Sequence, residues 1–239
     1  MKILIGCPTY ERYEYCIDLW LKAVKKIIEF SRKEGHEADY LLVDNSKTQD
    51  FYLKMQLKGA NIVRSPYVEN VRQRIMDSRN VLREKALRER YDYFFSLEQD
   101  IIPEEDILVR LLNQNKKIIS AYYSKNMGMR VQDNETKKIN DIVLELPIVY
   151  LQQEGGVKRA NPHEVLRKGT ISVGAFGVGC LLIHREVLEK IKFRFERGKI
   201  AFDDFLFCLD AKNLGYGLFL DSNIKVNHLH RPWDDIKQD

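Results

Sequence analysis

Short apolar runs and longer amphipathic stretches alternate over the first hundred residues of the chain. The first run, residues 2–7, is apolar and β-branched, and apolar side chains then recur at helical spacing from Tyr15 to Ile27. A strand followed by a helix is therefore predicted. The pattern continues with predicted strands at residues 40–43, 60–63 and 93–97, a short helix ending at Leu57, and a helix over residues 71–90. Continuous apolar strands separated by helices favour a parallel sheet covered on both faces.

The second half of the chain is less regular. A helix is expected after Pro103, and a strand at residues 118–123, whereas residues 125–141 lose periodicity and are predicted to form a mobile, polar surface loop. The remaining prediction comprises extended elements at residues 143–151, 171–173, 180–183, 216–220 and 224–230, a loop at 152–169, and helices starting at Arg185 and at residue 203. Because neither an internal repeat nor an interdomain linker is visible, one domain over residues 1–239 is expected.

Composition supports a globular protein with a large core. The 239 residues are 44% hydrophobic and 31% charged, and a chain of this length buries roughly 70–75% of its unfolded surface on folding. The 39 Lys and Arg against 35 Asp and Glu give a net charge of +4. This excess is too small for a dedicated nucleic-acid binder, but it is compatible with an anionic small ligand.

Cysteine usage and hydropathy indicate a reducing compartment. The four cysteines form no C-x-x-C pair, and Cys7 and Cys180 lie in apolar runs typical of buried strands, so reduced thiols are expected. Residues 1–8 are too short an apolar stretch for a signal peptide, and no window approaches the roughly 18 apolar residues of a membrane span. We therefore expect a soluble, cytoplasmic protein, for which basic surface residues still permit peripheral contact with a membrane-borne substrate.

The first candidate site residues are polar residues at the ends of predicted strands. In an open α/β sheet, ligands bind at the carboxyl ends of the strands, and Thr9, Asp44 and Asp100 all occupy such ends. The segment from Glu98 to Asp100 offers two carboxylates, which suit Mg²⁺ or Mn²⁺ bridged to a diphosphate. An ordinary loop carboxylate or helix cap is an equally good interpretation of Glu98 taken alone.

Two further pairs of residues are candidates for the site only if they lie near the other candidate residues. His228 and His230 are two residues apart, so in a strand both side chains share one face, as a metal or phosphate site requires; plain surface histidines are the alternative. Asp203 and Asp204 open an apolar helix, where capping alone explains them. A base role for Asp204 requires that it face the same cleft as Asp100, because neighbouring carboxylates raise each other's pKa.

Two other patterns favour structural interpretations. Arg79 lies in an Arg-rich predicted helix whose interspersed acidic residues indicate a solvated face for most of its length. Gly174, Gly177 and Gly179 precede a strand rather than a helix, so they lack the context of a dinucleotide fingerprint. Close approach of the backbone to a ligand, or a tight turn, explains these glycines better.

Six segments form a series along the chain. They are Ile5-Gly6-Cys7-Pro8-Thr9-Tyr10, Val43-Asp44-Asn45-Ser46, Ser78-Arg79-Asn80, Phe95-Ser96-Leu97-Glu98-Gln99-Asp100, Gly177 to Leu188, and Asp203-Asp204-Phe205-Leu206-Phe207-Cys208 with the later Gly215-Tyr216, Asp221 and Val226-Asn227-His228. In this order they resemble the GT-A fold glycosyltransferases of the family 2 type, over almost the whole chain. The fourth segment stands where the family has its D-x-D motif, and the order and spacing of the last are the most specific part.

This resemblance implies a single-domain GT-A fold of the α/β class, with a mostly parallel, Rossmann-like sheet flanked by helices and a smaller mixed or antiparallel portion in the C-terminal half. Residues 1–100 would be the nucleotide-binding half, and residues 101–239 the acceptor-binding and catalytic half. The implied activity is transfer of a sugar from a UDP- or GDP-linked donor to a hydroxyl of a glycan or lipid-linked acceptor, with inversion. The implied cofactor is Mn²⁺ or Mg²⁺.

The resemblance also implies a role for each site residue. The nucleotide would be contacted by Thr9, Tyr10, Asp44, Arg79, Glu98 and Gln99, with Glu98 on the ribose side. The metal would be held by Asp100, with His228 beside it and the diphosphate. Asp204 would be the general base, with the adjacent Asp203 as the other candidate, and residues 125–141 would form an acceptor lid.

Three departures from the family pattern leave alternatives open. Glu98 replaces the usual first Asp, Asp203 replaces a Glu, and Leu206 replaces a second Asp. The departures suggest a second hypothesis, a nucleotide-sugar or glycan binding protein on the same fold without turnover. A third hypothesis is a nucleotidyltransferase that releases pyrophosphate from a nucleoside triphosphate, although the chain lacks a Gly-rich, Lys-containing loop after its first strand.

Overall fold

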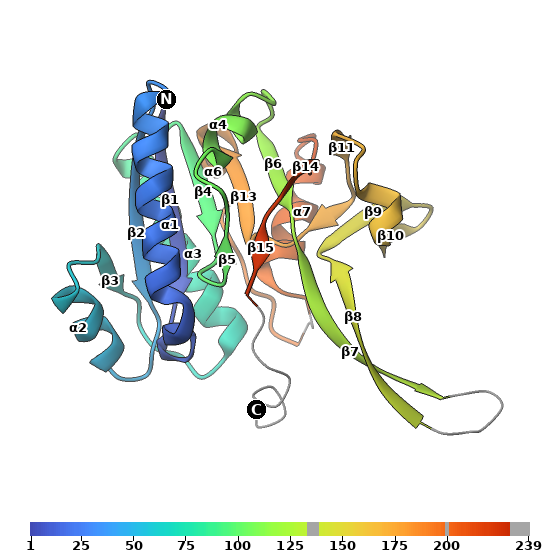
Figure 1. The fold of residues 1–239 in the computed structure, drawn as a ribbon, viewed down its shortest axis with the longest axis horizontal. Coiled ribbons are helices and arrows are strands. Elements are labelled where there is room, and N and C mark those ends of the chain that lie inside the picture. Colours follow the sequence, from blue (N-terminus) through green and yellow to red (C-terminus); the bar gives the residue numbers. More distant parts are fainter. Residues whose placement is uncertain (133–138, 199–200, 230–239) are drawn as a thin grey trace.

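The central element is one large mixed sheet. The computed structural model describes residues 1–132, 139–198 and 201–229. Eight strands lie in the order β11-β14-β6-β13-β4-β1-β2-β3, with helices on both faces (Figure 1). Strands β3, β2, β1 and β4 are parallel to one another, as are β6 and β14, whereas β13 runs antiparallel between β4 and β6. The predicted α/β class with a mostly parallel sheet is confirmed.

The N-terminal half follows the predicted alternation closely. Its elements are β1 (Lys2–Thr9), the short 3₁₀ helix η1 (Glu11–Tyr13), α1 (Glu14–Lys33), β2 (Glu37–Asp44), α2 (Asp50–Leu57), β3 (Ile62–Arg64), α3 (Val71–Arg88) and β4 (Tyr93–Leu97). Each predicted strand and helix of this half is present. The strands are buried apolar runs, so composition and hydrogen bonding favour the same structure.

The C-terminal half adds strands of both directions. Its larger elements are β5 (Ile101–Ile102), α4 (Ile107–Leu112), β6 (Ile118–Tyr122), β11 (Thr170–Ser172), β13 (Cys180–His184), α6 (Arg185–Lys190), α7 (Asp203–Asn213), β14 (Phe219–Lys225) and β15 (Asn227–His228). Strand β14 starts at Phe219, not at Tyr216 as predicted. The backbone N–H of Tyr216 still bonds to the carbonyl of Ala211, and Gly215 has a φ of 80°, so this stretch ends the preceding helix instead.

Two predicted loops are in fact structured. Residues 125–141 were expected to form a polar loop. Of these, residues 133–138 lie outside the described part of the chain, and the others belong to β7 (Ser124–Gln132) and β8 (Ile139–Pro147), which pair as a long antiparallel hairpin. The predicted loop at 152–169 contains β10 (Gly156–Arg159) and α5 (Pro162–Val165), and β10 joins β9 (Val149–Gln153) and β12 (Ala175–Phe176) in a small antiparallel sheet. The strands in both segments depend on pairing with other strands, which local periodicity does not reveal.

Two apolar cores lie on the two faces of the main sheet. On one face, α1 packs Trp20 and Ile27 against Ile3 and Ile5 of β1. On the other face, α3, α6 and α7 cover the sheet with residues such as Leu82 and Phe207. All four cysteines are buried and free, as predicted. No helix in the described part of the chain is long and apolar enough to span a bilayer.

Close packing in this second core leads to a prediction about Gly6. A Cβ atom at Gly6 would lie 2.4 Å from Phe94 Cε2 and 2.9 Å from Leu82 Cδ2. We expect Gly6→Ala to lower the free energy of unfolding by roughly 1–3 kcal/mol, because the added methyl overpacks the core. Urea unfolding followed by circular dichroism measures the change. Leu57→Ala, at a 90% exposed position, is the control and should change little; an unchanged midpoint for Gly6→Ala would contradict the packing seen here.

Candidate active site

The carboxyl edge of the sheet gathers most of the predicted site residues. Strands β1 and β2 end side by side, with Thr9 opposite Asp44 in the parallel register. Strand β4, on the other side of β1, leads into the segment that carries Glu98 and Asp100. Because parallel strands end at the same edge of a sheet, polar residues distant in the sequence meet here.

Arg79 of α3 connects two of these acidic segments. Its Nη1 donates to Oδ1 of Asp203 at 2.6 Å, and its Nη2 donates to Oε1 of Glu98 at 2.6 Å. The residue is only 3% exposed. Burial disfavours its charge, but the two carboxylates raise the pKa of Arg79 above its ordinary value. Each terminal nitrogen therefore holds one carboxylate, whereas Nε has no hydrogen-bond partner among the described residues. The two bridges support a positioning role for Arg79, and its contact with a nucleotide stays a prediction.

Asp203 and Asp204 differ sharply although they are adjacent. Both lie in the first turn of α7, where the helix dipole favours negative charge. Asp203 is 2% exposed and paired with Arg79. Asp204 is half-buried, and one of its oxygens accepts a bond from the N–H of Phe205 at 2.7 Å. Burial and the nearby charge of Asp203 raise the pKa of Asp204 to about 6, which suits proton acceptance near neutral pH.

Asp100 and His228 form a pair on the other side of Glu98. The Nε2 of His228 lies 3.1 Å from Oδ2 of Asp100, and its Nδ1 lies 2.7 Å from the carbonyl oxygen of Ser124. A carbonyl only accepts, so Nδ1 carries a proton and donates. In the neutral imidazole, the Nε2 lone pair then points toward the Asp100 carboxylate, the arrangement that metal-binding histidines use.

This pair fits a divalent cation held jointly with a ligand. Burial lowers the pKa of His228, but the Asp100 carboxylate and the Ser124 carbonyl raise it, with a net rise. The position of the His228 ring between the Asp100 carboxylate and the Ser124 carbonyl therefore favours positive charge. Within the described residues, no three His, Cys, Asp or Glu side chains form a complete metal cage. Mg²⁺-type ions commonly take one or two protein ligands and complete their shell with phosphate oxygens and water.

Both carboxylate oxygens of Asp44 contact other groups of the protein. Its Oδ1 accepts from both the backbone N–H and the hydroxyl of Ser46, and its Oδ2 lies 3.3 Å from Nε of Arg64. Burial raises its pKa, although the bonds from Ser46 lower it. These contacts order the turn after β2, so the present geometry explains Asp44 without a nucleotide.

Three buried polar side chains at this edge have no hydrogen-bond partner among the described residues. They are the hydroxyls of Thr9 and Ser96 and the amide of Gln99, of which both polar atoms are unpaired. Gln99 is only 2% exposed. Thr9 is the last residue of β1, and Ser96 and Gln99 lie in and just after the neighbouring parallel strand β4. Unpaired buried polar groups are costly, so they mark a place where a water molecule or a ligand is expected.

The remaining predicted residues are peripheral to these pairs. Tyr10 lies before η1 and packs edge-to-face on Tyr13, with ring centroids 5.1 Å apart. Leu206, one of the departures from the family pattern, is buried in the apolar core. His230 lies outside the described residues.

Three residues of this region were not predicted. The pKa of Tyr13 is raised by burial and by the charges of Asp100 and Glu98, so this tyrosine lies within electrostatic reach of both carboxylates. Tyr123 packs edge-to-face on His228 at 5.9 Å, and its hydroxyl accepts a bond from the N–H of Gly179 at 3.1 Å. Ser124 acts only through its backbone carbonyl, which no side-chain pattern reveals.

The Gly-rich turn supplied the only sequence signal for Tyr123. A Cβ at Gly177 would lie 2.3 Å from the Tyr123 hydroxyl oxygen, and a Cβ at Gly179 would lie 2.9 Å from it. The second position also lies 3.0 Å from a carboxylate oxygen of Glu98. The predicted close approach is therefore to the protein's own side chains at the site.

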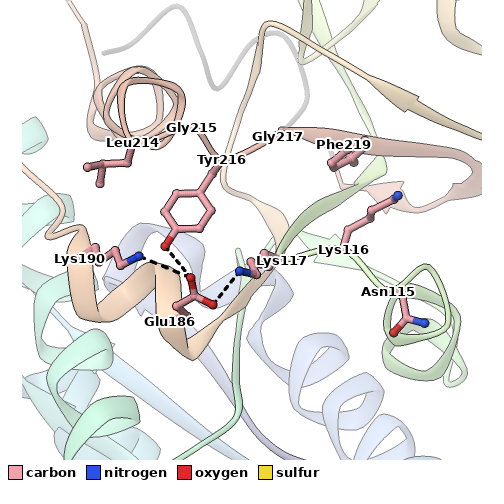
Figure 2. Close-up of a pocket in the computed structure, with 10 residues that line it drawn as sticks. All are labelled: Asn115, Lys116, Lys117, Glu186, Lys190, Leu214, Gly215, Tyr216, Gly217 and Phe219. Atoms are coloured by element: carbon pink, nitrogen blue, oxygen red, sulfur yellow. Dashed lines mark hydrogen bonds and ion pairs between the residues drawn. The ribbon is translucent and has the colours of Figure 1, made fainter.

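A separate cavity lies at the opposite edge of the main sheet. It has a volume of about 390 Å³ and lies between the start of β14, the end of α7 and α6 (Figure 2). Figure 2 shows Glu186 at its centre, accepting from Tyr216 at 3.1 Å and paired with Lys117 at 2.7 Å and Lys190 at 3.5 Å. None of the predicted site residues lines it, and its one carboxylate is already saturated with partners.

Comparison with known proteins shows similarity in structure only. Neither a protein-family model nor a curated protein sequence matches the chain. TarS residues 1–349 from S. aureus superimpose with a TM-score of 0.57 at 14% identity, over 95% of this chain and 59% of that one. The same TarS fragment has also been solved in complex with UDP.

Two further solved structures have the same architecture. GalNAc-T7 with UDP, GalNAc and Mn²⁺ gives a TM-score of 0.58 at 13% identity, over 97% of this chain and 44% of that one. Glucosyl-3-phosphoglycerate synthase from M. tuberculosis, with Mn²⁺, UDP and glucosyl-3-phosphoglycerate, gives 0.51 at 12% identity, over 99% and 75%. This chain thus spans less than two thirds of TarS and of GalNAc-T7. The predicted GT-A fold, shared with nucleotide-sugar transferases, is confirmed.

The ion pairs of Arg79 lead to a stability prediction. We expect Arg79→Met to lower the free energy of unfolding by roughly 3–5 kcal/mol, because the substitution leaves the buried Asp203 carboxylate without its partner. Chemical unfolding monitored by fluorescence measures the change. Arg88→Met on the same helix, where the side chain is 70% exposed, is the matched control. Adding Asp203→Asn to Arg79→Met should restore part of the loss, and a neutral effect of Arg79→Met would contradict the bridging role.

Proposed function

We propose that this protein is a metal-dependent glycosyltransferase that moves a sugar from a nucleoside-diphosphate donor to an acceptor hydroxyl. The observation that carries the proposal is the convergence, at one sheet edge of a GT-A fold, of a candidate cation pair and a recessed carboxylate. The pair is Asp100 and His228, and the recessed carboxylate is Asp204. The charge of Glu98 raises the pKa of Asp204, and both carboxylates raise the pKa of the intervening Tyr123, so these groups belong to one cluster.

Donor binding would use the edge formed by β1 and β4. Asp100 and His228 would hold Mn²⁺ or Mg²⁺, which when bound neutralises the charge that develops on the departing diphosphate. The unpaired Thr9 hydroxyl and Gln99 amide, at the same sheet edge, would supply hydrogen-bonding groups for a nucleotide. We propose UDP as the first candidate, because TarS, GalNAc-T7 and the mycobacterial synthase were all solved with it.

Asp204 would act as the general base of the transfer. The acceptor hydroxyl gives its proton to Asp204 while its oxygen forms a bond to the anomeric carbon. The bond from that carbon to the diphosphate breaks, and its electron pair leaves with the diphosphate. Attack opposite the leaving group inverts the anomeric centre. Asp203 is excluded from this role in the proposal because its carboxylate is buried and bound to Arg79.

Calorimetric titration tests the donor site directly. We expect wild-type protein to bind UDP in the presence of Mn²⁺, and to bind it at least tenfold more weakly without the metal or in Asp100→Asn, since one carboxylate ligand is lost. GDP serves as the comparison nucleotide. The matched control is Asp50→Asn at an exposed position of α2. Failure of both nucleotides to bind under every condition would contradict the proposal.

The pKa of Asp204 predicts the pH profile. A base must be deprotonated to act, so kcat/KM should fall tenfold per pH unit below about 6 and level off above it. Asp204→Asn should lower kcat by at least 100-fold while UDP affinity stays within about twofold. Release of UDP from candidate UDP-sugars measures the rates. Full activity of Asp204→Asn, or a profile without this limb, would contradict the assignment, and UDP binding without any turnover would favour a binding protein.

A further inference from the structure

One face of the hairpin of β7 and β8 is mostly apolar, with the exposed Lys125 at its base opposite Leu146. The hairpin forms a two-stranded sheet of its own and reaches out from the body of the protein (Figure 1). Met127 lies opposite Leu144 in the register, and directly opposed residues share a face. Ile142 and Leu146, two residues from Leu144 on either side, share it too. Ile142 is 37% exposed and Leu144 39% exposed.

The other face of the hairpin is largely polar at its base. Asn126 lies opposite Glu145, and the hydroxyl of Ser124 donates to the Glu145 carboxylate. An isolated two-stranded ribbon is only marginally stable in water, and an apolar face of this kind normally meets a partner. The question is therefore which molecule covers Met127, Ile142, Leu144 and Leu146.

A continuous set of contacts joins this apolar face to Asp204. The Nη1 of Arg159 donates to Sδ of Met127 at 3.1 Å. The guanidinium of Arg159 lies over the ring of Tyr150 at 5.0 Å, and its Nη2 donates to the Tyr150 hydroxyl at 2.5 Å. The Tyr150 ring in turn packs edge-to-face on Phe205 at 4.6 Å, and Phe205 directly follows Asp204. Two aromatic rings, those of Tyr150 and Phe205, thus lie in the series of contacts between a cation and the residue next to the candidate base.

No carboxylate neutralises the charge of Arg159. Its two terminal nitrogens each have one protein partner, Met127 and Tyr150, and each carries a second N–H that an anion can accept. The residue is half-buried, and no carboxylate lies within ion-pairing distance of it in the described part of the chain. Burial and the charge of Asp204 raise the pKa of Tyr150, while Arg159 lowers it, so Tyr150 lies within reach of both charges. A partly desolvated guanidinium binds phosphate or carboxylate oxygens strongly and with directional bonds.

We infer that the acceptor of the proposed transferase is an anionic amphiphile. Its reacting hydroxyl lies at Asp204, its phosphate or carboxylate group lies on Arg159, and its apolar chain lies along Met127, Leu144 and Ile142. This inference rests on the proposed function and adds the chemical class of the acceptor. The transfer itself is unchanged: the hydroxyl proton moves to Asp204, and the sugar moves from the diphosphate to the hydroxyl oxygen.

Octyl phosphate, below its micellar concentration, is the probe for this site. By calorimetry, we expect it to bind the wild-type protein at least tenfold more tightly than either inorganic phosphate or 1-octanol, because only octyl phosphate satisfies both parts of the site. Arg159→Gln should reduce its affinity about tenfold, toward that of octanol, and Leu144→Gln should reduce it toward that of phosphate. Arg159→Lys, which keeps the charge, should restore part of the binding.

Matched controls separate the site from general surface effects. Arg110→Gln on α4 removes a charge of similar exposure, and Leu53→Gln on α2 removes a leucine that is 45% exposed. Neither should change octyl phosphate binding. Circular dichroism spectra and thermal midpoints verify that each variant is folded.

The outcomes distinguish this inference from the proposed function. Octyl phosphate binding that is unaffected by Arg159→Gln and Leu144→Gln overturns the inference. Sedimentation that shows a wild-type dimer dissociated by Leu144→Gln also overturns it, because a second copy then covers the apolar face. Absence of UDP binding to the wild-type protein contradicts the proposed donor site instead. The octyl phosphate site is then still tested by Arg159→Gln and Leu144→Gln.

Discussion

The geometry of the site depends on one buried guanidinium. Arg79 must keep its charge inside the protein, and a desolvated cation is tolerated only when carboxylates meet it closely. The two that do so come from different elements, Glu98 after β4 and Asp203 at the start of α7. The ion pairs of Arg79 therefore fix the end of β4 against the start of α7, more than a hundred residues later in the chain. The same first turn of α7 also positions Asp204.

The charge balance of the cluster supports the proposed role of a cation in binding an anionic donor. Glu98, Asp100, Asp203 and Asp204 contribute four carboxylates, against one guanidinium and the imidazole of His228. A diphosphate approaching this edge would meet a net negative field, which repels it. In the proposed function, a divalent cation between Asp100 and His228 would reverse that local field, so metal binding and donor binding would depend on the same excess of carboxylates.

The sequence predicted those features that follow from local patterns. Buried β-branched runs such as residues 2–7 locate the parallel strands, and the carboxyl ends of those strands locate Asp100 and its neighbours. The hairpin after Ser124 was missed because strand pairing across β7 and β8 satisfies its backbone, and its apolar face appears only when the register is known. Tyr13 and the Ser124 carbonyl were missed because only the tertiary fold brings them to the site.

Two of the departures from the glycosyltransferase pattern, at Glu98 and Asp203, compensate each other. The resemblance places an Asp at the position of Glu98 and a Glu at the position of Asp203, so the longer and shorter carboxylates are exchanged. Both contact Arg79, each at 2.6 Å. One methylene gained on the β4 side is matched by one lost on the α7 side, and the guanidinium keeps two close partners. The exchange therefore conserves the bridge, and taken separately neither departure argues against catalysis by Asp204.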